Sequence, residues 1–133
     1  MEDCVAITDA GLKYITSLKK LKHLELTQAI NVTEEALWQN LSGLVPQLRV
    51  LNLGNCDNVG DTTLFNLASL DSSLLPLQSL TLTGCRLVSG KGLGYLAQHL
   101  DGKLGQLTSF SVDISIFSAS NLRPFRERGI HLQ

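Results

Sequence analysis

The amino-acid sequence predicts an α/β repeat fold, in which short parallel strands alternate with helices around one shared core. One apolar pattern recurs four times, and its first leucines are 27, 29 and 30 residues apart, a regularity typical of repeat proteins. Apolar residues at helical spacing follow each copy. The four copies are Leu21-Lys-His-Leu24-Glu-Leu26, Leu48-Arg-Val-Leu51-Asn-Leu53, Leu77-Gln-Ser-Leu80-Thr-Leu82 and Leu107-Thr-Ser-Phe110-Ser-Val112.

Each predicted strand is expected to be buried on one face and exposed on the other. Its second and third apolar positions are two residues apart, so both side chains point to the same side of an extended chain. Their neighbours point to the opposite side and are mostly small and polar. The expected exposed residues are His23, Glu25, Thr27, Val50, Asn52, Gly54, Ser79, Thr81, Thr83, Ser109, Ser111 and Asp113.

A shared loop motif leads from each strand to the following helix. One position, three residues beyond the last apolar residue of the strand, is occupied in turn by Ala29, Cys56, Cys85 and Ser115, and Cys4 fits the same position. Thr33 before Glu34 then resembles a helix start, because a hydroxyl accepts hydrogen bonds from free backbone N–H groups and a carboxylate favours the positive helix end. Thr8 before Asp9 repeats this signature. The helical apolar residues are Leu12, Ile15, Leu18, Leu37, Leu41, Leu44, Leu64, Leu67, Leu70, Leu93, Leu96 and Leu100.

Over about residues 4–115 this pattern resembles the cysteine-containing class of leucine-rich repeats found in F-box/leucine-rich-repeat proteins. The loop Cys85-x-x-Val88-Ser89-Gly90-x-Gly92-Leu93 shows the resemblance. It implies a ribonuclease-inhibitor-like, right-handed solenoid with a concave parallel sheet of about four strands and convex helices. It also implies that Cys4, Cys56 and Cys85 are buried structural thiols.

The length of 133 residues suits a single domain. We expect a partial first repeat in residues 1–20, repeats in 21–115 and a closing cap in 116–133. The chain begins inside a loop, with no leucine strand before Cys4, so an upstream continuation or a frayed end is expected. No full strand is predicted after Pro124.

Composition disfavours several classes of partner. Eleven Lys and Arg against 12 Asp and Glu give a net charge of −1, too little positive charge for nucleic acid. No apolar run reaches the roughly 18 residues of a membrane span, and the first residues lack the basic start of a signal peptide. Three cysteines without a terminal cluster favour a reducing compartment, so we expect a cytoplasmic or nuclear protein.

No residue constellation predicts an enzyme, a cofactor or a metal site. Cys56 and Cys85 lie one repeat apart, near enough for a disulfide, but stacked equivalent side chains favour two thiols. The stretch from Gly84 to Gly92 superficially resembles a phosphate loop, yet its glycine spacing is wrong and no hydroxyl follows Lys91. His23 beside Glu25 lacks a neighbouring nucleophile, so the pair is interpreted as binding chemistry.

Three further features are candidates for partner binding. The basic stretch from Lys19 to His23 is a candidate docking site for an acidic partner. The cluster of Arg123, Arg126 and Arg128 is another candidate, although such cations also suit the end of a helix stopped by Gly129. Trp38 fits either a partly exposed binding anchor or the core.

The resemblance implies a non-enzymatic protein–protein interaction module. Its expected partner-binding residues on the concave face are His23, Glu25, Thr27, Val50, Asn52, Ser79, Thr81, Thr83, Ser111 and Asp113. Substrate recognition in a ubiquitin ligase adaptor is one expected role. An F-box would begin with a Leu-Pro pair followed by an acidic residue, but Pro46, Pro76 and Pro124 all fall in repeat loops or in the cap. An assembly or regulatory scaffold without a ubiquitin role is the alternative.

Overall fold

A parallel β-sheet covered on one face by helices forms the protein. The computed structural model describes residues 4–7, 20–26, 33–70 and 74–133. Within these ranges six strands pair in sequence order, each parallel to the next. They are β1 (Cys4–Ile7), β2 (His23–Leu26), β3 (Val50–Asn52), β4 (Ser79–Thr81), β5 (Ser109–Ser111) and β6 (His131–Leu132). The predicted α/β class is therefore confirmed.

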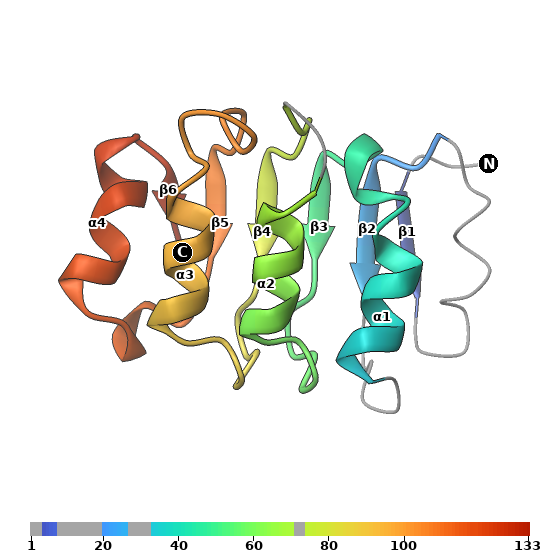
Figure 1. The fold of residues 1–133 in the computed structure, drawn as a ribbon, viewed down its shortest axis with the longest axis horizontal. Coiled ribbons are helices and arrows are strands. Elements are labelled where there is room, and N and C mark those ends of the chain that lie inside the picture. The colour runs from blue at the N-terminus through green and yellow to red at the C-terminus, as the bar shows by residue number, and fades with distance from the viewer. Residues whose placement is uncertain (1–3, 8–19, 27–32, 71–73) are drawn as a thin grey trace.

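In the described part of the chain, four α-helices lie over the same face of the sheet (Figure 1). They are α1 (Glu34–Leu41), α2 (Asp61–Ala68), α3 (Gly90–Ala97) and α4 (Ala119–Glu127), accompanied by the short 3₁₀ helices η2 (Val45–Gln47) and η3 (Ile114–Ile116). The predicted start at Thr33 is confirmed, since its hydroxyl accepts a hydrogen bond from the Ala36 amide at 3.1 Å. The predicted start at Thr8 lies outside the described residues.

The recurring apolar positions align across the sheet. Leu24 pairs with Leu51, Leu51 with Leu80, and Leu80 with Phe110. These residues are buried in one cluster with the helix leucines, because the strand side chains alternate and the helices cover only one side. The predicted shared interior is confirmed for the described part of the chain.

The sheet extends further at both ends than the sequence indicated. Cys4 was expected in a loop, but it begins β1 and pairs in register with His23. At the other end, the two-residue strand β6 pairs with β5 in the segment expected to be a cap without a full strand. The prediction of about four strands is therefore corrected to six among the described residues. The sequences of β1 and β6 lack the leucine pattern, so that pattern could not reveal them.

Helix α3 contains glycines in two contrasting environments. A Cβ atom on Gly92 would come within 2.9 Å of Leu64 Cδ1 and even closer to the Asp61 carboxylate, whereas one on Gly94 would meet nothing within 4 Å. We expect Gly92→Ala to lower the free energy of unfolding by about 1–3 kcal/mol through overpacking. Gly94→Ala should raise it by about 1 kcal/mol, because alanine restricts the unfolded chain and favours helix.

Urea denaturation of both alanine variants beside the wild-type protein tests this pair of opposite shifts. A destabilised Gly94→Ala variant would contradict the open surroundings of Gly94, and an unchanged Gly92→Ala variant would contradict the close approach of α2 to α3.

Candidate protein-binding face

The sheet face turned away from the helices presents two rows of aligned residues. One row contains the register partners His23, Val50, Ser79, Ser109 and His131, and the other contains Glu25, Asn52, Thr81 and Ser111. We call His23, Glu25, Val50, Asn52, Ser79, Thr81, Ser109 and Ser111 the strand face. Because neighbouring strands lie about 4.8 Å apart, an extended or flat partner surface can contact several of these side chains at once.

A histidine and a glutamate lie together on the strand face. His23 Nε2 is 3.0 Å from Glu25 Oε1, and the two side chains are 33% and 39% exposed. Their neighbours on β3 are Val50 and Asn52, as the sequence predicted. The side-chain oxygen of Asn52 accepts a hydrogen bond from the Gly54 amide at 2.9 Å, which fixes its orientation.

At the opposite end of the strand face, the predicted residues are already engaged within the protein. Ser111 is buried, and its hydroxyl lies 3.1 Å from the side-chain oxygen of Gln133. The Asp113 carboxylate accepts a hydrogen bond from the Gly84 amide at 3.0 Å. Thr83 is exposed beyond β4, whereas Thr27 lies outside the described residues. The half-exposed end around Glu25 and Asn52 is therefore better suited to contact a partner.

Cys56 and Cys85 lie in the loops that follow β3 and β4, and each thiol contacts a backbone oxygen at the end of the preceding strand's unit. Both are buried thiols, which confirms the prediction that they do not form a disulfide. Cys85 Sγ donates to the backbone oxygen of Leu53 at 3.0 Å, and Cys56 Sγ lies 3.8 Å from that of Leu26. Each thiol thus links its loop to the end of an earlier strand. Cys4 occupies a different position, at the start of β1, and its side chain lies outside the described residues.

Burial gives Cys85 a pH-dependent contribution to stability. Desolvation is the main reason that its thiol pKa rises from 9.0 to about 12. Between these pH values the unfolded chain loses a proton that the folded chain retains, so the free energy of unfolding falls as pH rises. Below pH 9 this contribution is complete.

We expect the stability difference between wild type and Cys85→Ala to shrink by roughly 1 kcal/mol per pH unit above pH 9. Urea denaturation of both proteins at several pH values measures this difference, in which the titration of other groups cancels. A difference that stays constant as pH rises would show that the Cys85 thiol titrates alike in both states.

Carboxylates connect consecutive helices in a way that local sequence did not reveal. The Glu34 carboxylate was assigned to its own helix, but it accepts hydrogen bonds at 2.8 Å from the Gly60 and Thr63 amides at the start of α2. It also accepts one from the Thr63 hydroxyl at 2.5 Å. Asp61, one unit later, accepts hydrogen bonds from the Ser89 amide and hydroxyl at the start of α3. The sequence signal that could have indicated this contact was Gly60, because a glycine at the start of α2 has no side chain to cap that helix and leaves its amides for another residue.

Cations occupy helix C-termini. Lys103 Nζ donates to the backbone oxygens of Ala68, at 2.6 Å, and Leu70, beyond α2. Arg126 lies in the last turn of α4, and Arg128 pairs with Asp101. Gly129 has a φ of 74°, which confirms the predicted left-handed stop.

The remaining candidates have separate locations. Trp38 packs partly against the core and keeps intermediate exposure. Lys20 and Lys22 are exposed, while Lys19 lies outside the described residues.

Among the described residues, no group of three or more His, Cys, Asp or Glu could hold a metal ion. Within the same ranges, no helix combines the length and apolar character needed to cross a membrane.

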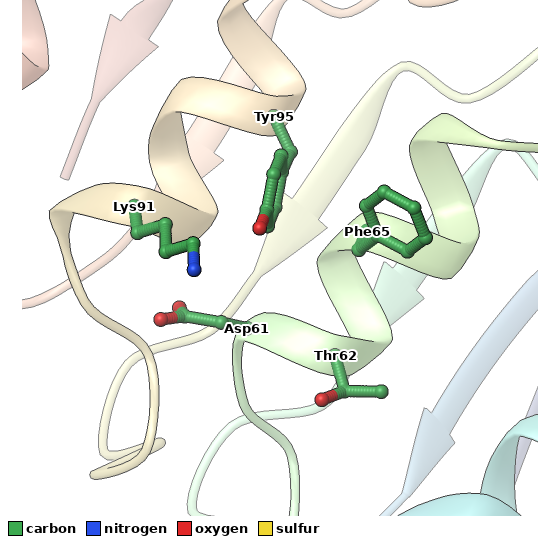
Figure 2. Close-up of a pocket in the computed structure, with 5 residues that line it drawn as sticks. All are labelled: Asp61, Thr62, Phe65, Lys91 and Tyr95. Carbon is green, nitrogen blue, oxygen red and sulfur yellow. The ribbon is translucent and has the colours of Figure 1, made fainter.

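A pocket of about 310 Å³ lies between α2 and α3 and was not predicted from the sequence. Its lining residues are Asp61, Thr62, Phe65, Lys91 and Tyr95 (Figure 2). The sequence had singled out Lys91 only as part of the rejected phosphate loop. Phe65 and Tyr95 lie 30 positions apart in the chain, so only the packing of α2 beside α3 brings them together.

A scan of the chain against models of known protein families finds no match.

Proposed function

We propose that this chain is a leucine-rich-repeat protein whose units stack into a right-handed solenoid with the strand face on its concave side. The support is the repeated strand pattern together with the sequential parallel sheet. Parallel strands joined through a helix are almost always connected with right-handed chirality. The buried thiols of Cys56 and Cys85 at equivalent positions of successive units agree with the cysteine-containing class.

We further propose that the protein is a non-enzymatic module that binds another protein through the strand face. The observation that supports this function is the alignment of polar side chains in register across neighbouring strands. The rows combine hydroxyl and amide groups with the His23 and Glu25 pair, so hydrogen bonding rather than a strong electrostatic field would select the partner.

The size of the strand face defines how a partner would bind. A stable interface covers about 800 Å² on each side, which is more than a few short strands about 4.8 Å apart provide. The partner would therefore also contact the loops at the strand ends, where Thr83 and Asn55 are exposed. Further repeats in a longer chain would enlarge the same surface.

A charge-reversal variant tests the location of this interface. We expect Glu25→Arg combined with Asn52→Arg to weaken partner binding at least tenfold, because both half-exposed positions lie side by side on β2 and β3. The control is Gln39→Arg with Gln98→Arg, which adds exposed arginines to α1 and to the residue that follows α3, on the helix side.

Affinity capture with the wild-type protein would supply the partner, and titration of the purified partner would give its affinity for each variant. Retained binding in a folded strand-face variant would move the interface elsewhere. Loss of binding in both variants would show an effect of added charge rather than of position.

The same capture separates two roles within this proposed function. Recovery of the cullin-type ligase machinery that depends on the wild-type chain would support substrate recognition in a ubiquitin ligase adaptor. A partner set without that machinery would support an assembly or regulatory scaffold.

A further inference from the structure

The pocket between α2 and α3 lies on the helix side, away from the strand face, and it combines an exposed phenylalanine ring and a partly buried tyrosine ring with a cation. Phe65 is 50% exposed. Its ring meets that of Tyr95 edge to face, with centroids 5.2 Å apart and an interplanar angle of 69°. The ring of Phe65 is exposed although water solvates apolar surface poorly, so it offers a wall against which a flat apolar group gains by burial.

Of the two charged residues that line the pocket, Asp61 has hydrogen-bond partners within the protein and Lys91 forms no ion pair among the described residues. Both carboxylate oxygens of Asp61 accept hydrogen bonds from Ser89, at the positive end of α3. Lys91 is exposed, and no ion pair joins its ammonium to any residue in the described ranges. Figure 2 shows Lys91 extending toward Asp61 and the hydroxyl end of Tyr95. The Lys91 ammonium, beside the rings of Phe65 and Tyr95, is therefore the charged group that can still pair with a ligand.

We propose that this pocket binds a small aromatic carboxylate, with its ring against Phe65 and Tyr95 and its carboxylate beside the Lys91 ammonium. The Tyr95 and Thr62 hydroxyls supply further donors at the rim. The volume of about 310 Å³ is at the lower end of the range for ligand pockets, which suits one ring with a short acidic arm rather than a nucleotide.

A cationic ligand is the opposing possibility, because aromatic rings and a carboxylate also attract ammonium groups. Two features disfavour it. Asp61 already accepts two hydrogen bonds from Ser89, and Lys91 would repel a second cation at the same opening.

NMR titration of the isotope-labelled full chain with 3-phenylpropanoate tests the site. The matched probes are neutral 3-phenylpropanamide and cationic 2-phenylethylammonium. We expect the acid to bind with a Kd of about 1–10 mM at low salt, shifting the amides of residues 61–65 and 91–95. The amide should bind at least threefold more weakly, and the cation more weakly still.

Two matched variants identify the cation responsible. Lys91→Met should weaken binding of the acid about threefold to fivefold. Arg86→Met also removes an exposed positive charge, from the loop before α3 and outside the pocket lining, and should leave the Kd unchanged. Phe65→Leu keeps an apolar side chain but removes the ring, and it should weaken the acid and the amide alike.

Equal binding of acid and amide, tighter binding of the cation, or shifts centred outside α2 and α3 would each overturn the proposal.

A tetrapeptide ending in phenylalanine distinguishes two sources of an aromatic carboxylate, a free acid and the C-terminus of a protein. Binding as tight as that of the free acid would assign the ligand to a protein C-terminus, and absent binding would assign it to a free acid.

Discussion

Phe125→Ala is expected to lower the free energy of unfolding by about 3–5 kcal/mol, the largest effect of any substitution considered. Phe125 is 0% exposed, and its ring stacks on that of Phe110 with centroids 4.8 Å apart. Truncation removes buried apolar area and leaves a cavity between α4 and β5, which neighbouring side chains fill only in part. Because domains of this size have about 5–15 kcal/mol of stability, the variant would approach the limit of folding.

Urea denaturation measures this loss, and Phe125→Leu provides a variant that remains folded, with an expected loss of about 1–2 kcal/mol. The control is Phe65→Ala, because Phe65 is half exposed and should contribute about 1 kcal/mol. Similar losses for Phe125→Ala and Phe65→Ala would contradict the burial of the Phe110 and Phe125 stack. Hydrogen exchange should also show the first loss of protection in α4 and β6.

Glu34→Ala should lower the free energy of unfolding by about 2–3 kcal/mol. This loss is large for a partly exposed residue at the start of a helix. The substitution removes the acceptor for the Gly60 amide and for both the amide and the hydroxyl of Thr63. Thr63 is 2% exposed, so water cannot readily replace the lost partner. Gly60 offers no side chain as a substitute cap.

Two variants separate the cross-helix role of Glu34 from a general effect of charge. Glu35→Ala removes the neighbouring exposed carboxylate and should change stability by less than about 1 kcal/mol. Glu34→Gln keeps one acceptor oxygen and should lose about half as much as Glu34→Ala. If Glu34→Ala and Glu35→Ala lose equal stability, the bonds from Glu34 to α2 do not support the second helix.

Much of the strand layout follows from local pattern. The alternation in Leu24-Glu-Leu26 and its later copies identified which side of each strand is buried, because side chains alternate along an extended chain. The helix start at Thr33 and the left-handed stop at Gly129 were also predictable, since each depends on a single side chain or on its absence. These features involve residues within a few positions of one another.

Other features escaped sequence analysis for a common reason. β1 and β6 pair with their neighbours without the leucine pattern, so hydrogen bonding to an adjacent strand defines them. The same limit applies to Cys4, whose spacing matched a loop position although its backbone belongs to a strand. The residues of the pocket at Phe65 and Tyr95 come from different helices, and periodicity describes only one helix at a time.

The sequence by itself determined the repeat period, the buried leucine positions and the polar character of the opposite strand side, because these depend on side-chain chemistry and on alternation along the chain. Only the tertiary structure decided that Glu34 and Asp61 cap the helices that follow their own, and that Lys103 reaches back to α2. A carboxylate or an ammonium at a helix end binds whichever backbone groups lie within hydrogen-bonding distance. That distance is set by how one unit packs on the next, and not by the neighbouring letters of the sequence.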